Sequence, residues 1–89
     1  MGWTVTERPH ESREQLLERI SVDPRVAHGR PVVAGTRVWV TTVLDWLADG
    51  RTVEEVLTEY PQLEPADVRA CVAYGAELTR FHDITVEPV

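Results

Sequence analysis

The chain has 89 residues and a mass of 10.1 kDa, which allows one small domain and leaves no room for a second. Hydrophobic residues make up 43% of it and aromatic residues 7%, so we expect a thin core that needs a partner copy for stability. No apolar run reaches the about 18 residues of a membrane span, and no secretory signal is recognisable. A single cysteine, Cys71, excludes an internal disulfide, so we expect a cytoplasmic protein without membrane contact.

The net charge of -6 is unevenly distributed, and every positive residue other than histidine is an arginine. Residues 24–44 contain three arginines and no acidic residue, whereas residues 45–68 contain seven acidic residues and one arginine. Because phosphate contacts supply most nonspecific affinity for nucleic acid, an acidic chain is a poor general binder of it. The pattern is typical either of two solvated faces or of two surfaces for partners of opposite charge.

The N-terminal part of the chain has weak structural signals. Residues 1–9 show no clear hydrophobic period, so we expect an arm or a short strand there. The stretch from His10 to Arg19 predicts a short polar helix with Leu16, Leu17 and Ile20 on one side. We therefore treat residues 1–19 as an N-terminal arm and a short helix that precede the main domain.

Residues 20–40 change character, because they are rich in valine and contain two prolines and two glycines. Alternation at residues 20–22 and 38–40 predicts short strands, and Ala34–Thr36 predicts a hairpin turn with Gly35 at positive φ. Pro31 cannot donate to a strand ladder, so its strand should lie at an edge or begin there. Such short strands are best stabilised by pairing with a second copy.

Three helices are predicted after residue 40. The first is capped by Thr41 or Thr42, runs through Ala48 and is closed by Gly50. The next begins with a capping box, in which the Thr52 hydroxyl and the Glu55 carboxylate bond each other's backbone amides. Pro61 ends it. The residues expected to face inward are Val43, Leu44, Leu47, Val53, Val56, Leu57 and Tyr60.

The last helix is predicted from Pro65, a residue that suits a first helical position, to about Thr79. Asp67 and Arg80 complement the helix dipole at its two ends. Its expected buried face consists of Val68, Cys71, Val72, Gly75 and Leu78.

These elements predict an α+β fold that is mainly α. A short N-terminal β-hairpin region precedes a three-helix core of the helix-turn-helix kind, similar to a homeodomain or winged helix. We expect one domain over residues 20–80, with the β-hairpin at 20–40 and helices at 41–80, and a C-terminal tail at 81–89. The connections also fit other small helical bundles, and we expect a homodimer formed through the β region.

No catalytic constellation emerges from the residue pattern, so we do not expect an enzyme, a cofactor or a metal. The three histidines and Cys71 lack a shared ligand spacing, and Cys71 falls on a predicted buried face. The carboxylates are better explained as a solvated helix face than as an acid–base pair, because the chain has little volume for a cleft. Residues 28–37 invite a phosphate-loop interpretation but lack the Lys-Ser/Thr pair of a Walker loop.

Binding is the better interpretation of the basic segment. Arginines on the hairpin supply phosphate contacts that acidic helices do not, and two copies would place several guanidinium groups on one side. The candidate DNA-binding residues are Arg25, Arg30, Thr36, Arg37 and Arg69, the last near the exposed start of a candidate recognition helix. The candidate dimer-interface residues are Val38, Trp39 and Val40.

Several segments between Ile20 and Leu78 together carry a resemblance to a known family. They are residues 20–24, 29–38, 50–57, 60–63, 67–68 and 73–74. The most specific block is Gly-x-Pro-x-x-x-Gly-Thr-Arg at residues 29–37, followed by Tyr-Pro-x-Leu at residues 60–63. On these residues the chain resembles the family called domain of unknown function 433. It departs from the family at Glu64, where a better helix cap such as threonine is usual.

The resemblance implies a small bacterial protein similar to VapB-type antitoxins of toxin–antitoxin pairs. It implies a PIN-like ribonuclease toxin encoded nearby as the partner, and operator DNA to which the complex binds to repress its own operon. Two alternatives stay open from the residues themselves. One is a protein-interaction module without DNA affinity, because a candidate recognition helix carrying Glu64 and Asp67 should repel DNA. The other is a nucleotide binder or small enzyme that uses Gly29–Arg37.

Overall fold

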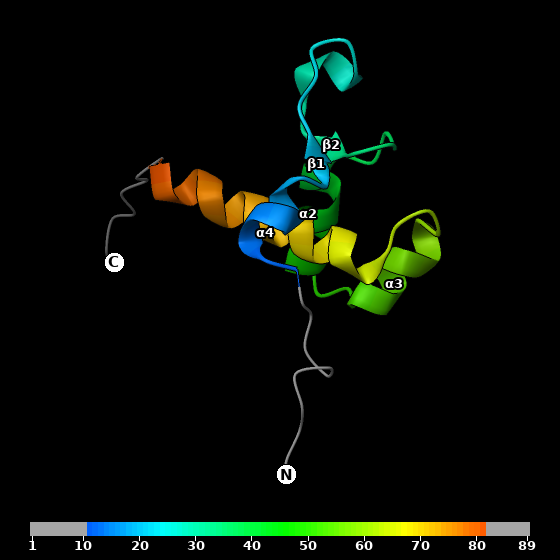
Figure 1. Cartoon of the computed structure of the whole chain (residues 1–89). Coiled ribbons are helices and arrows are strands. Elements are labelled where there is room, and N and C mark those ends of the chain that lie inside the picture. Colours follow the sequence, from blue (N-terminus) through cyan, green and yellow to red (C-terminus); the bar gives the residue numbers. More distant parts are fainter. Residues whose placement is uncertain (1–10, 82–89) are drawn as a thin grey trace, which may run out of the picture.

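The computed structural model describes residues 11–81 of the chain (Figure 1). The predicted arm at residues 1–9, the predicted helix start at His10 and the tail from residue 82 onward lie outside the described residues. Within them the chain forms four α-helices, a two-stranded antiparallel sheet and one short 3₁₀ turn. The mainly helical α+β class predicted from the sequence is therefore confirmed.

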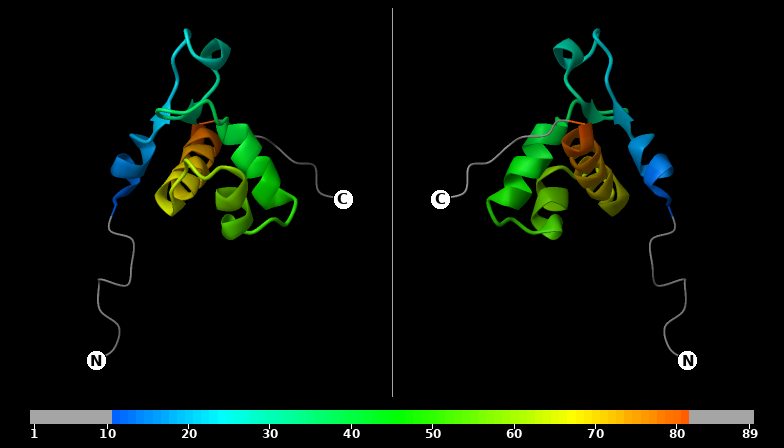
Figure 2. Two further views of the ribbon diagram at one scale, coloured as in Figure 1. Left: turned by 90° about the vertical axis from the view of Figure 1, so that its right-hand side faces the viewer. Right: turned by 90° about the vertical axis from the view of Figure 1, so that its left-hand side faces the viewer.

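The longest helix, α4 (Pro65–Phe81), lies at the centre of the fold. Helix α1 (Arg13–Leu17) packs on one side of it, and α2 (Val40–Ala48) and α3 (Val53–Glu59) pack on the other, as Figure 2 shows. The small sheet sits at one end of this arrangement, and the connection between its two strands projects beyond the helices (Figures 1 and 2). None of the helices between residues 11 and 81 has the length and apolar content that crossing a bilayer requires.

The hydrophobic core lies where the sheet, α2, α3 and α4 meet, and valine dominates it. No tryptophan or phenylalanine is among its fully buried members in the described residues, so the core is as thin as the composition predicts. The buried cluster consists of Val33, Val38, Val40, Val43, Val56, Leu63, Val68 and Cys71.

Helix α1 is shorter than predicted but has a well-formed start. The Ser12 hydroxyl accepts a hydrogen bond from the Gln15 amide at 3.1 Å, and the Gln15 side chain accepts one from the Ser12 amide at 2.8 Å. This capping box begins the helix at Arg13. The helix ends at Leu17, because the chain must extend at Ile20 to enter the sheet.

The sheet contains a strand pair in addition to the predicted hairpin. Strand β1 (Ile20–Ser21) runs antiparallel to β2 (Val32–Val33), with Ile20 opposite Val33. The predicted strand at residues 38–40 is confirmed in part: Trp39 makes an antiparallel bridge to Val32, and the Val33 amide donates to the Val38 carbonyl at 2.9 Å and the Val40 amide to the Pro31 carbonyl at 3.0 Å, but α2 already begins at Val40. The predicted turn at Ala34–Thr36 is present, and it leads from β2 directly into α2.

The caps of α2 and α3 can be compared with the caps predicted from the local sequence. Trp39, not a threonine, is the N-cap of α2, and Gly50 follows its end with φ +95°, as predicted. The Thr52–Glu55 capping box of α3 is confirmed, with hydrogen bonds of 3.1 and 2.8 Å. Val53 is 38% exposed and does not face inward, since it lies in the first turn, where side chains point back past the helix start.

Helix α4 buries a different face from the predicted one over part of its length. Val68 and Cys71 are buried as predicted, but Val72 is 50% exposed and Leu78 is 44% exposed. Gly75 faces α2 as predicted, because a Cβ there would be 3.2 Å from Leu44. Three alanines that were not predicted to face inward are also buried on α4, namely Ala66, Ala70 and Ala73.

Candidate functional site

The connection between β1 and β2 carries two of the candidate DNA-binding arginines at an exposed end of the molecule. The Arg25 guanidinium donates to both carboxylate oxygens of Asp23, each at 3.1 Å. These hydrogen bonds, with a further one from the Arg25 amide, hold the pKa of Asp23 below its usual value. The Arg30 guanidinium lies over the Trp39 ring, 4.5 Å from its centroid. Both side chains are therefore oriented by neighbours while their charges stay at the surface.

A left-handed turn at the tip of this connection brings Arg30 back towards the helices. Ala27, His28 and Gly29 all have positive φ, at 51°, 58° and 82°. Such a conformation costs a residue with a side chain about 1–2 kcal/mol. The turn is held by hydrogen bonds from the Gly29 amide to the Val26 carbonyl and from the Arg30 amide to the Ala27 carbonyl.

The second element of the site is the tight turn that follows β2. The Thr36 amide donates to the Val33 carbonyl at 3.0 Å, and Gly35 has φ +80°, the conformation of a type II turn. The Thr36 hydroxyl donates to the Val33 carbonyl at 2.7 Å and accepts from the Val38 amide at 3.0 Å. Thr36 thus stabilises the turn that precedes Arg37, and its hydroxyl proton is donated to the Val33 carbonyl.

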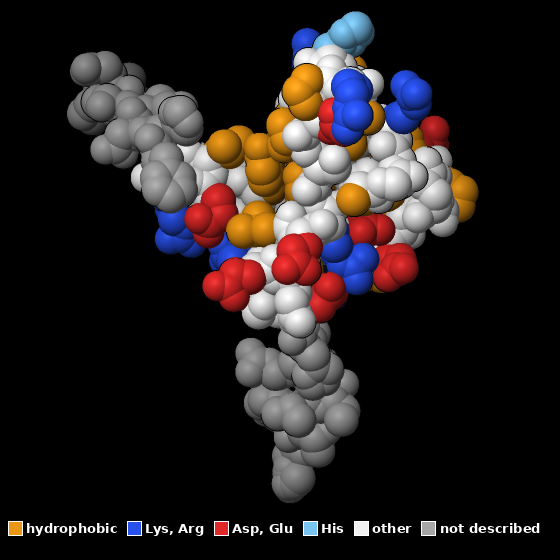
Figure 3. Space-filling view, turned by 45° about the horizontal axis from the view of Figure 1, so that its top comes forward, with side chains coloured by type: hydrophobic (Ala, Val, Ile, Leu, Met, Phe, Trp, Pro, Cys, Tyr) orange, Lys and Arg blue, Asp and Glu red, His pale blue; other side chains and the backbone are white. Residues whose placement is uncertain are grey.

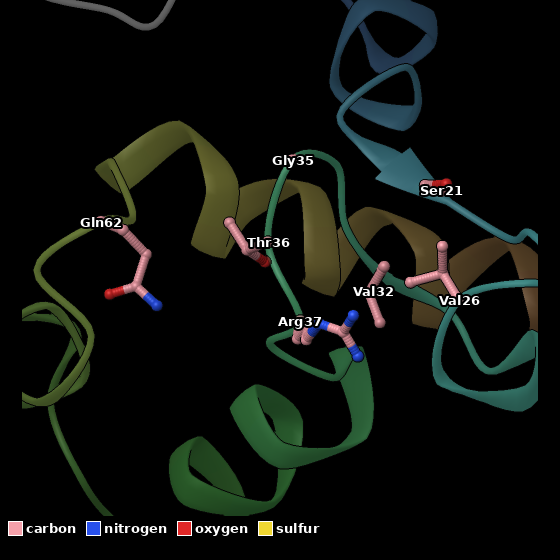
Figure 4. Close-up of a pocket in the computed structure, with 7 residues that line it drawn as sticks. All are labelled: Ser21, Val26, Val32, Gly35, Thr36, Arg37 and Gln62. Atoms are coloured by element: carbon pink, nitrogen blue, oxygen red, sulfur yellow. The ribbon is translucent and has the colours of Figure 1, made fainter.

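Two neighbouring clefts lie beside this turn, and Arg37 and Gln62 line both of them. The larger has a volume of about 610 Å³ and lies between the turn, the β1–β2 connection and the α3–α4 connection (Figure 4). In Figure 4 the Arg37 guanidinium is directed toward Val32, and Gln62 comes from the opposite side. The smaller cleft, of about 350 Å³, is also lined by Val38, Trp39, Thr42 and Tyr60.

The charge of Arg37 is not compensated by any other described residue. Most arginines between residues 11 and 81 have a fixed partner: ion pairs hold Arg13, Arg19, Arg25 and Arg80, and tryptophan rings hold Arg30 and Arg51. Within that range Arg37 has neither kind of partner. An exposed guanidinium in an open cleft, beside a free amide side chain, suits a phosphate or carboxylate ligand.

Arg25, Arg30 and Arg37 together form what we call the arginine edge. Figure 3 shows arginine and histidine side chains gathered at the end where the β1–β2 connection projects. Most acidic side chains visible in that view lie nearer the helices (Figure 3). The uneven charge along the sequence thus becomes an uneven charge across the surface.

A sequence model of one protein family, described as "Protein of unknown function (DUF433)", matches residues 20–75, which is more than half of the chain. The chain belongs to the DUF433 family. The matched range contains both strands, the whole arginine edge, α2, α3 and the first eleven residues of α4. No curated protein and no solved structure matches the chain.

Arg69 lies apart from the arginine edge of the DUF433 domain. It is exposed on α4 and lines a groove between α4 and α1, together with Arg13. The structure therefore brings Arg25, Arg30 and Arg37 to one end but does not add Arg69 to them. The start of α4 is also acidic, because Glu64 and Asp67 lie there.

The candidate dimer-interface residues of the DUF433 domain have separate environments. Val38 and Val40 are buried in the core of a single chain, at 6% and 3% exposure. Only Trp39 of the three is exposed, at 36%, and Arg30 covers one face of its ring. Dimerisation stays a prediction, and of this set only Trp39 offers side-chain surface for it.

The described part of the DUF433 domain has no evident centre for nucleophilic or metal chemistry. Cys71 is buried, and desolvation, with the nearby charge of Asp67, raises the pKa of its thiol to about 12. Between residues 11 and 81, no group of three or more histidine, cysteine or acidic residues could hold a metal ion.

Two features of the structure were not predicted from the sequence. Gln62 is the variable position of the Tyr-Pro-x-Leu block, and only the fold shows that it faces Arg37's cleft. Arg19 donates to Glu11 at 2.9 Å and to Asp67 at 3.1 Å, and these bonds raise the pKa of its guanidinium. A contact between residues 48 positions apart leaves no local signal in one sequence.

Proposed function

We propose that this protein is the antitoxin of a type II toxin–antitoxin system. In this proposal it binds and neutralises a PIN-like ribonuclease encoded nearby and contacts operator DNA to repress its own operon. Membership of the DUF433 family fits the resemblance that suggested this function, although the family's description assigns none. The observation that carries the DNA half is Arg37, an exposed guanidinium without a described partner at an edge that also holds Arg25 and Arg30.

In this proposal the residues that contact DNA lie on loops and not on a recognition helix. Helix α1 packs on α4, and the start of α4 carries Glu64 and Asp67, which disfavour phosphate nearby. The arginine edge carries the opposite charge, and the β1–β2 connection, which holds Arg25 and Arg30, projects beyond the helices (Figure 1). One copy offers only a few phosphate contacts, so the proposal includes a homodimer that presents two edges to the duplex.

A mobility shift with a fragment of the gene's own promoter tests the proposal directly. It should be measured at low salt, with and without the neighbouring gene product. Arg37→Ala should weaken binding and reduce the slope of log K against log salt by about one. Arg51→Ala is the matched control, because Arg51 stacks on Trp46, 4.2 Å from its ring centroid, and lines neither cleft beside Arg37.

The absence of a shift under both conditions would refute DNA binding. An unchanged salt slope for Arg37→Ala would refute the assigned contact. The second candidate function is a module that only sequesters a protein partner. The net charge of -6 and the exposed acidic residues of α3 favour it. Stable binding to the ribonuclease without any DNA affinity would support this second function.

A further inference from the structure

A second surface of the molecule, separate from the arginine edge, has the properties of a docking groove. It lies between α1 and α4 and has a volume of about 270 Å³. Its lining is mainly apolar, formed by Leu16 of α1 and by three residues of α4, of which Val72 is half exposed. The residues of α4 that contribute apolar surface are Val72, Ala73 and Ala76. An exposed valine over two alanines leaves room for a side chain from another molecule.

The charged residues of the groove are all positive. Arg13 and Arg69 line it, and no acidic residue does. Within residues 11–81 Arg69 has no ion pair, and Arg13 pairs with Glu77 at 3.3 Å, with side chains that are 48% and 29% exposed. Such exposed pairs contribute little to stability, so Arg13 can exchange Glu77 for a carboxylate from a partner.

We propose that this groove binds a segment of the ribonuclease partner in which a few apolar side chains are flanked by carboxylates. The inference rests on the antitoxin function proposed above. It assigns the binding of the ribonuclease to the surface formed by α1 and α4. Apolar side chains would cover Val72 and fill the space over the alanines, and carboxylates would pair with Arg13 and Arg69.

A second copy of this chain is a poorer occupant. A two-fold interface is isologous, so the same lining residues would meet across the axis. Since the charged residues of that lining are both arginines, the two copies would bring like charges together. Charge complementarity thus favours an acidic partner segment.

The test compares two exposed valines on different helices. The neighbouring ribonuclease is purified, and its affinity for the full-length chain is measured by calorimetry. Val72→Glu should weaken binding about tenfold or more, because it places a carboxylate in the apolar contact. Val53→Glu, on α3 and outside the groove, should bind within about twofold of the wild type.

A second variant keeps the test independent of how well Val72→Glu folds. Arg69→Ala removes an exposed side chain and should weaken ribonuclease binding about fivefold or more, with a smaller salt dependence. Arg51→Ala is its control. Hydrogen exchange in the complex should slow in α1 and along residues 69–76, and it should not slow in α3. The promoter shift should be retained by both groove variants.

The outcomes separate this inference from the proposed function. If the wild type binds the ribonuclease and Val72→Glu and Arg69→Ala bind equally well, the groove assignment is refuted and the antitoxin function stands. If the wild type does not bind the ribonuclease at all, the antitoxin function is refuted. If Val72→Glu converts a dimer to a monomer in light scattering without changing ribonuclease binding, a second copy covers the groove and the inference is overturned.

Discussion

Replacement of Asp67 by alanine removes the residue that ties Arg19, in the segment after α1, to the start of α4. One carboxylate oxygen of Asp67 accepts a hydrogen bond from Arg19 at 3.1 Å, and the other accepts one from the Glu64 amide at 2.8 Å. The residue is only 7% exposed. Asp67→Ala therefore leaves a helix-start amide and a half-buried guanidinium without one of their acceptors.

The expected cost follows from these two bonds. Loss of a side-chain cap at a helix start costs about 1 kcal/mol. Loss of a hydrogen bond to a charged group costs about 1.5–3 kcal/mol, but Arg19 keeps its bonds to Glu11, so the lower end applies. Together these give about 2–3 kcal/mol, equivalent to a fall in Tm of about 10–20 °C for a domain of this size.

Thermal and urea denaturation, followed by circular dichroism, measure this cost. A double-mutant cycle with Arg19→Ala should give a coupling energy of about 1–2 kcal/mol, because the two residues bond directly. Glu59→Ala is the control, since Glu59 is exposed on α3, and it should change stability by less than about 0.5 kcal/mol. A loss below about 1 kcal/mol for Asp67→Ala, or a coupling near zero, would refute the reasoning.

Three further predictions follow from local contacts. Thr52→Ala should lower the free energy of unfolding by about 1 kcal/mol in urea denaturation, because it removes half of the capping box with Glu55; a wild-type midpoint would contradict this. Gly35→Ala should lower the free energy of unfolding by about 1 kcal/mol. The φ of +80° alone causes this loss, since no atom lies within 4 Å of the added Cβ, and Gly35→Asn should lower the free energy of unfolding less. Cys71 should resist a thiol reagent in the folded state. Because folding raises the pKa of its thiol from 9.0 to about 12, the contribution of the protonated thiol to folding stability is full below pH 9 and is lost as the pH rises towards 12.

Elements whose signals lie within a few residues were predictable from the sequence. The capping box at Thr52, the glycine after α2 and the proline at the start of α4 each act through neighbours in the chain. The turn around Gly35 is of the same kind, because a type II turn needs positive φ at one position. For this reason the positions of α2, α3 and α4 were predicted to within a few residues.

Features that depend on distant partners were not predictable. Alternation indicated the pairing of β2 with residues 38–40, which the Val32–Trp39 bridge shows, but it did not indicate that Ile20 pairs with Val33. The predicted buried face of α4 was partly wrong because the residues that are buried there include three alanines, which carry little hydrophobic signal, while Val72 and Leu78 are exposed. The arginines of the site were candidates on the sequence alone, and only the fold shows that Arg37 is unpaired among the described residues and that Arg69 lies elsewhere.

The position of α1 links the two proposed surfaces. Helix α1 precedes the range that the family model matches, and so does Arg19 after it, whereas Asp67, which Arg19 bonds, and Ala73, which lines the groove, lie inside that range. The arginine edge, in contrast, is built entirely from residues within the matched range. The DNA contact would therefore be a property of the domain itself, while the groove exists only where α1 is held against α4. Arg19→Ala removes the side-chain link between the segment after α1 and the start of α4, so it should weaken ribonuclease binding. It should leave the promoter shift intact, since the Arg19 side chain bonds Glu11 and Asp67 and lines neither cleft beside Arg37.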